Sequence, residues 1–113
     1  MKKSLKLIQA GFESSSETTE EFKKFFKVFI EEMTVILKEF WAEKIEFTRG
    51  HFYVYGFFDI GDNVYYFSIS DVRYFPGEDL LVRIARDHKD YSGWRNEYCR
   101  LDNLEEDLRY IIT

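Results

Sequence analysis

The side chains best suited to chemistry in this sequence are two histidines, His51 and His88, and a single cysteine, Cys99. Histidines that share a metal ion commonly follow spacings such as HxH, HxxxH or HExxH, and none of these occurs here. Cys99 paired with His88 would form a nucleophile, although no local signature accompanies the pair. A small metal-dependent hydrolase built on His88 and Asp90 is a further alternative. Because no catalytic or metal-binding motif is present, the sequence predicts a protein without catalytic residues, bound metal or cofactor.

The first candidate for binding is a polar and aromatic stretch, residues 87–97, which joins two predicted strands. Loops on a rigid sheet carry function disproportionately, and Trp94 and Arg95 belong to the residue types most enriched at interface hot spots. Carboxylates beside such anchors would speed association with a basic partner. An ordinary turn with Trp94 packed beneath it is the alternative. The candidate partner contacts in and near this loop are Glu78, Asp79, Asp87, Asp90, Tyr91, Trp94, Arg95 and Glu97.

A second candidate surface follows from a predicted β-hairpin. Residues 51–60 and 64–75 are rich in β-branched and aromatic residues, and Gly61-Asp62-Asn63 between them is a three-residue hairpin signal. We expect Ile60 to pair with Val64. One face of the hairpin then carries five large side chains: Tyr53, Tyr55, Phe57, Phe67 and Ile69. Such a face suits a protein interface, with Tyr53 and Tyr55 as contacts, or a platform for stacked bases, unless a terminal segment covers it.

The opposite face of the hairpin is predicted to receive a long helix. In the same pairing, Gly56, Ser68 and Ser70 form a patch of small residues that leaves room for bulky side chains. Apolar residues recur at helical spacing over residues 19–43, after a Thr18-x-x-Glu21 capping box. The apolar face of this helix comprises Phe22, Phe25, Phe26, Phe29, Ile30, Met33, Ile36, Leu37, Phe40 and Trp41. A stripe of this kind is typical of a core.

Further strands complete the sheet. Residues 45–48 alternate as a strand before an Arg49-Gly50 turn, and residues 80–86 and 97–101 form two more. Because the strands follow one another directly, the sheet is expected to be antiparallel.

A final helix begins at an Asp102-x-x-Glu105 capping box, with Leu104, Leu108 and Ile111 facing inward. The predicted fold is therefore α+β. A long N-terminal helix packs on an antiparallel sheet of four or five strands, with a short C-terminal helix, in a single domain over residues 1–113.

Arginines offer a third candidate site. Arg73, Arg83 and Arg100 could converge on one side of the sheet and bind a carboxylate or phosphate bidentately. Internal ion pairs are the competing interpretation, since residues 49–113 contain eight Asp and four Glu. The corresponding alternative function is a module that binds nucleic acid or a small anionic ligand through the aromatic sheet face and the arginines.

Composition limits the classes of function. At 113 residues, with 45% hydrophobic and 33% charged residues, the chain fits one globular domain. A net charge of −5 disfavours direct nucleic-acid binding, because an acidic surface repels phosphates. The first residues lack the apolar run of a signal peptide, and no stretch is long enough for a membrane span. Together with the single cysteine, these features predict a cytoplasmic protein that does not bind membranes.

The chain resembles small proteins from phages and mobile elements of Gram-positive bacteria in four segments within residues 51–108: HFYVYGFF, VYYFSISDVRYFPG, LLVRIARDHKDYSG and NLEEDL. The resemblance implies an accessory protein, and compact acidic inhibitors of host defence, anti-CRISPR proteins among them, form a sizeable class in that setting. Such inhibitors act by binding, so the implied partner is a host protein that handles nucleic acid, such as a defence nuclease. We therefore predict a small acidic protein-binding domain that is not an enzyme. An exposed aromatic face is also compatible with a homodimer.

Overall fold

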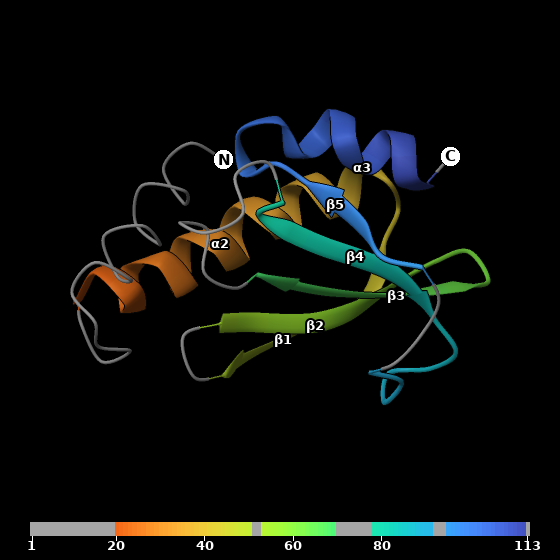
Figure 1. Ribbon diagram of the computed structural model, residues 1–113, viewed down its shortest axis with the longest axis horizontal. Helices are drawn as coiled ribbons and strands as arrows, with labels where there is room; N and C mark the ends of the chain where they lie inside the picture. The colour runs from red at the N-terminus through yellow and green to blue at the C-terminus, as the bar shows by residue number, and fades with distance from the viewer. Residues whose placement is uncertain (1–19, 51–52, 70–77, 92–94, 113) are drawn as a thin grey trace.

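The computed structural model describes residues 20–50, 53–69, 78–91 and 95–112. The elements are α2 (Glu20–Glu39), β1 (Glu43–Gly50), β2 (Tyr53–Ile60), β3 (Asn63–Ile69), β4 (Leu80–Ala85), β5 (Glu97–Cys99), the 3₁₀ turn η1 (Leu101–Asn103) and α3 (Leu104–Ile112). The strands form one antiparallel sheet in the order β1-β2-β3-β4-β5. Both helices lie on one side of this sheet (Figure 1). The predicted α+β fold, with a long helix before the sheet and a short one after it, is confirmed.

Some predicted boundaries differ from the structure. β1 continues through Arg49 and Gly50, where a turn was predicted. Predictions for Thr18, His51 and Arg73 fall outside the described residues. Neither described helix is long and apolar enough to cross a membrane.

The core lies between the helices and the sheet. Helix α2 contributes a row of fully buried side chains at every fourth position: Phe25, Phe29, Met33 and Leu37. The ring of Phe29 lies 5.9 Å from that of Phe47 on β1 and 6.3 Å from that of Phe67 on β3. Burying a large apolar side chain contributes roughly 1.5–3 kcal/mol. This aromatic cluster is therefore a main source of stability.

The helix α2 ends earlier than predicted. The backbone N–H of Ala42 donates to the carbonyl of Leu37 (3.1 Å) and that of Trp41 to the carbonyl of Lys38 (3.0 Å), the paired bonds of a Schellman motif. Trp41 occupies the left-handed position of this motif, with φ 59°, where glycine is usual. This conformation costs roughly 1–2 kcal/mol for a residue with a side chain. Trp41, predicted to lie on the apolar helix face, is consequently 84% exposed.

The turn between β2 and β3 is one residue shorter than predicted. Ile60 pairs with Asn63 rather than with Val64, so the connection is the two-residue turn Gly61-Asp62. Gly61 has φ 60°, a value that glycine adopts without steric cost and that tight hairpin turns require.

This difference exchanges the faces of β3. Because side chains alternate along a strand, a shift of one residue moves each β3 side chain to the other face relative to β2. Phe67 and Ile69, predicted on the second face, are fully buried on the helix side. Gly56 pairs with Phe67 instead of Ser68, so the predicted patch of small residues does not form. A Cβ at Gly56 would lie 1.8 Å from the Glu46 carbonyl oxygen, so this close approach requires glycine.

The C-terminal helix α3 packs in the same layer as α2. Leu104 and Leu108 are buried as predicted, and Ile111 packs at the margin of the core. Asp102 does not cap α3, because it lies inside η1, and the capping position of η1, Arg100, makes no side-chain cap hydrogen bond. Neither of the two described helices lies on the opposite face of the sheet.

Candidate protein-binding surface

The sheet face opposite the helices carries several tyrosines. Cross-strand pairs connect Tyr55 of β2 to Tyr98 of β5 through Ser68 and Leu81. The neighbouring row contains Glu46, Phe57, Tyr66 and Arg83. We call this surface the tyrosine face and define it by Tyr55, Phe57, Tyr66, Tyr91 and Tyr98. Phe57 and Tyr66 are themselves buried in a small second cluster with Ala85, at 2% and 9% exposure. Tyr91 and Tyr98 expose 54% and 44% of their surface.

Residues 86–91, which follow β4, fold across the tyrosine face. The ring of Tyr91 lies 5.5 Å from that of Phe57, 5.9 Å from that of Tyr66 and 6.0 Å from that of Tyr55, with interplanar angles of 64°, 82° and 72°. Tilted and edge-to-face contacts are favourable because the positive edge of one ring meets the negative face of another. Tyr91 thus anchors the loop and also presents a partly exposed ring.

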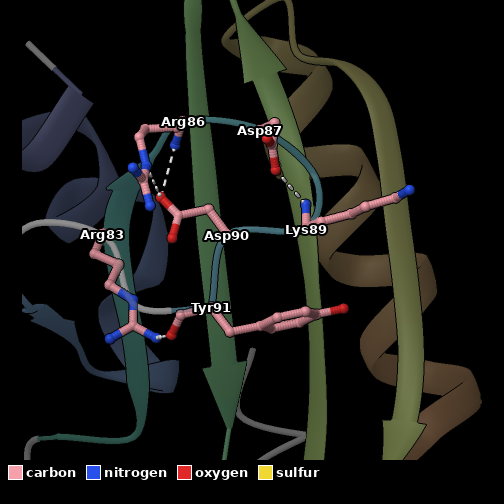
Figure 2. Close-up of polar contacts among 6 residues, drawn as sticks. All are labelled: Arg83, Arg86, Asp87, Lys89, Asp90 and Tyr91. Atoms are coloured by element: carbon pink, nitrogen blue, oxygen red, sulfur yellow. Dashed lines mark hydrogen bonds and ion pairs between the residues drawn. The ribbon is translucent and has the colours of Figure 1, made fainter.

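Two aspartates shape the turn that precedes Tyr91. Asp87 is exposed, yet its Oδ1 accepts a hydrogen bond from the backbone N–H of Lys89 (2.7 Å). The carboxylate of Asp90 points toward Arg86, whereas Lys89 extends away from this pair (Figure 2). Asp90 Oδ2 accepts from the backbone nitrogen (3.0 Å) and Nε (3.3 Å) of Arg86. Asp90 is 7% exposed, so its charge is satisfied within the loop.

Arg83 connects the loop to β5. Its guanidinium lies 4.6 Å from the centre of the Tyr66 ring, where a cation is attracted to the ring face. It donates to the carbonyl of Tyr91 (Figure 2) and to Oδ1 of Asn96 at 3.3 Å. Nδ2 of Asn96 then donates to the hydroxyl of Tyr98 (3.5 Å). This series of contacts links the backbone of Tyr91 to the hydroxyl of Tyr98, with the last contact the longest.

His88 connects the loop to β1 and β2. Its ring stacks on Phe57 with centroids 5.2 Å apart, Nε2 lies 2.6 Å from Asp59 Oδ1, and Nδ1 lies 3.2 Å from Glu46 Oε2. Partial burial lowers the pKa of His88, but hydrogen bonds and attraction from the two carboxylates outweigh burial and raise the pKa above its ordinary value. The carboxylates approach opposite nitrogens, so the three groups cannot share one ion. No cluster of metal ligands occurs in the described residues.

Two of the predicted contact residues, Asp79 and Asp90, are buried. Asp79 is 9% exposed and accepts a hydrogen bond from the backbone N–H of Leu101 (2.9 Å). Burial raises the pKa of Asp79 although that bond opposes the shift. Arg95 and Glu97 form an ion pair with each other at 2.9 Å. Asp79, like Asp90, therefore does not present a carboxylate to a partner, whereas Glu78 is exposed.

The tyrosine face differs from the predicted aromatic face. Trp94 and the side chain of Tyr53 fall outside the described residues, and Tyr55 lies on this face as predicted. Sequence reasoning missed Tyr66, because the error in register placed it on the helix side. It also missed Tyr98, although the alternation of exposed Tyr98 with buried Cys99 is a signal that could have identified it.

The structure separates the candidate nucleophile from its candidate base. Cys99 is fully buried in the core under the helices, and burial raises its pKa to about 12. A buried neutral thiol is not a nucleophile. His88 stacks on Phe57 on the other side of the sheet, so Cys99 and His88 do not act as a pair.

Of the three arginines predicted to converge, Arg83 and Arg100 lie apart, and Arg73 is outside the described residues. Arg83 lies on the tyrosine face, whereas Arg100 pairs with Asp107 of α3 at 3.4 Å. With the pairs Arg86–Asp90 and Arg95–Glu97, these contacts agree with internal ion pairing rather than with an anion site.

Comparison with models of protein families, with curated proteins and with solved structures finds no match.

Proposed function

We propose that this chain is a small non-enzymatic protein-binding domain that contacts its partner through the tyrosine face. The observation that carries the proposal is the pair of partly exposed rings, Tyr91 and Tyr98. The Tyr91 ring packs against Phe57, Tyr66 and Tyr55, and the Tyr98 hydroxyl accepts a long hydrogen bond from Asn96. Tyrosines combine an apolar ring with a polar tip, which suits the centre of an interface. Because their positions are fixed before binding, association would cost little side-chain entropy.

The partner that we propose is a host protein that handles nucleic acid, which the chain would inhibit in the phage or mobile-element setting implied by its sequence. Support comes from the net charge of −5, which favours association with a basic surface. Two exposed carboxylates, Asp87 and Glu46, lie at the loop side of the tyrosine face. At the rim of an interface such charges mainly raise the association rate.

A comparison of three substitutions in the full chain tests this function: Tyr91→Ala, Tyr98→Ala and Tyr110→Ala. Tyr110 is the matched control, because it is 87% exposed on α3 in the helix layer. Each tagged chain is incubated with a lysate of a Gram-positive bacterium, and the captured proteins are quantified by mass spectrometry. Calorimetry with the purified partner follows. A hot-spot tyrosine contributes about 2 kcal/mol or more, roughly a thirtyfold change in Kd.

We expect the wild type and Tyr110→Ala to retain one nucleic-acid-handling protein that Tyr91→Ala and Tyr98→Ala lose. Equal capture by all four chains would exclude the tyrosine face as the contact surface. Fluorescent single-stranded oligonucleotides provide the second arm of the test. Micromolar binding that weakens steeply with salt and is abolished by Tyr55→Ala would favour nucleic-acid binding instead.

A further inference from the structure

A groove of about 580 Å³ runs between helix α2 and strand β1, away from the tyrosine face. Its apolar lining consists of Ile30 from α2, Ala42 from the connection, and Ile45 and Phe47 from β1. All four side chains are partly exposed. A space of this size is within the range that holds bound ligands and peptide side chains.

Strand β1 forms one wall of this groove and stands at the edge of the sheet. It pairs with β2 on one side, and no strand of the described residues lies on its other side. An edge strand presents backbone N–H and C=O groups that can pair with an added strand. On β1 the pairing with β2 is regular over Glu46–Gly50, after a register shift between Glu43 and Glu46, so an added strand would pair along that part. A helix beside such an edge supplies a second wall for the side chains of that strand.

The charged groups around the groove are mainly cationic. Lys38 and Lys44 line it with a single acid, Glu43. At the Phe26 end of α2, the guanidinium of Arg49 lies 5.9 Å from the Phe26 ring. This cationic rim contrasts with the net charge of −5 of the whole chain. It therefore attracts carboxylates rather than basic segments.

The backbone at the end of the groove adds an independent observation. Trp41 and Lys44 have φ values of 59° and 52°, the left-handed conformation that favours glycine. Trp41 is 84% exposed, so its indole does not contribute to the core. The φ of Trp41 belongs to the Schellman motif that ends α2, and Lys44 lies where the register of β1 against β2 shifts between Glu43 and Glu46. Lys44 lines the groove with Ala42 and Glu43, and Trp41 directly precedes them in the chain.

We propose that this groove is a second docking site, which accepts an acidic, extended segment of a protein partner as an added strand beside β1. Alternate apolar side chains of the segment enter the groove, its carboxylates contact Lys38 and Lys44, and Trp41 packs against its end. The first twelve residues of this chain fit poorly, because they contain Lys2, Lys3 and Lys6 and no acid. The site is independent of the tyrosine face.

Selection of a displayed library of random twelve-residue peptides on the full chain tests this site. We expect enriched peptides to alternate apolar residues with Asp or Glu. Their affinities are then measured by fluorescence polarisation with synthetic peptides. Lys38→Glu combined with Lys44→Glu should weaken binding at least tenfold at low salt. Lys89→Glu, an exposed lysine in the loop on the other side of the sheet, is the matched control and should leave binding unchanged.

The variant Trp41→Gly distinguishes a loss of peptide affinity from a loss of stability. Glycine relieves the left-handed strain, so the urea midpoint should rise while peptide affinity falls at least tenfold. Hydrogen exchange of β1 amides should slow when peptide binds, because an added strand protects them.

Three outcomes would overturn the proposal. The first is a selection without enrichment, or with peptides that lack acidic residues. The second is unchanged affinity in Trp41→Gly or in the lysine double variant. The third is tighter binding of a twelve-nucleotide oligothymidine that competes with the peptide, which would make the groove a nucleic-acid site.

Discussion

The helix-covered face of the sheet and the tyrosine face contain similar residue types that are held in different ways. On the first, rings such as Phe29 and Phe67 are fully buried and packed against other apolar groups. On the second, Tyr91 and Tyr98 remain partly exposed, and their positions depend on hydrogen bonds and charges of Arg83, Asn96 and the neighbouring loop. Aromatic content alone therefore does not distinguish a core from a binding surface. The exposed fraction of each ring does, because the rings of Phe29 and Phe67 are fully buried and those of Tyr91 and Tyr98 are not.

Rings held by apolar burial and rings held by a hydrogen-bonded loop should respond differently to substitution. Apolar burial is lost only when the whole domain unfolds, because each ring contacts several elements. A hydrogen-bonded loop can open locally while the core stays intact. Each substitution below is therefore assigned to one face, and global and local stability are measured separately.

Phe29→Ala should have the largest effect. Phe29 is fully buried among Phe25, Phe47 and Phe67, so its removal loses transfer free energy and leaves a cavity. We expect a loss of about 3–5 kcal/mol in the free energy of unfolding, measured by urea denaturation. A loss below about 1 kcal/mol would show that this face is not the core.

Asp90→Ala should have the next largest effect, confined to the loop. It removes the acceptor of two bonds from Arg86, and hydrogen bonds to charged groups contribute about 1.5–3 kcal/mol. Amide exchange in residues 86–91 should speed up more than exchange in β2 and β3. Asp87→Asn is the control, because an Asn side-chain oxygen can still accept from Lys89. Equal acceleration throughout the chain would show that the loop is not an independent unit.

The contribution of His88 should depend on pH. Its folded pKa is raised, so protonation favours the folded chain, and this stabilisation is complete below about pH 6.5, the ordinary pKa of histidine. It disappears as pH rises through the folded pKa. The difference in urea midpoint between wild type and His88→Gln should therefore be larger at pH 6 than at pH 9, and Glu46→Gln should reduce that dependence. A difference that grows with pH would contradict the assigned carboxylate contacts.

Tyr98→Phe should have the smallest effect. It removes a hydroxyl that accepts one long contact from Asn96 at a partly exposed position. The expected change in unfolding free energy is within about 0.5 kcal/mol, similar to that of Tyr110→Phe on α3. A much larger loss would place Tyr98 among the structural residues and weaken its assignment as a binding residue.

The order and type of the elements could be predicted from the sequence because their signals are local. Helix α2 follows from the four-residue recurrence of Phe25, Phe29, Met33 and Leu37, and the strands follow from alternation. The C-terminal end of α2 could not be predicted. The Schellman motif has Trp41 at the position where glycine is usual, and a tryptophan there indicates from sequence that the helix continues.

The candidate site was less accessible to prediction. Which residues of β3 join the tyrosine face depends on the length of one turn, and Gly61-Asp62-Asn63 is compatible with both a two-residue and a three-residue connection. The burial of Asp79 and Asp90 depends on backbone N–H groups of Leu101 and Arg86. Composition shows the carboxylates but not which of them are already bonded.

The two-residue turn also limits how the length of this hairpin can change. A single inserted residue that re-registers β3 would exchange its inward and outward side chains, placing Phe67 at the surface and Tyr66 in the core. Two inserted residues restore the alternation and only lengthen the hairpin. Length variation between β2 and β3 should therefore be tolerated in steps of two, and a variant with an odd insertion should keep its function only when the extra residue bulges out of the ladder.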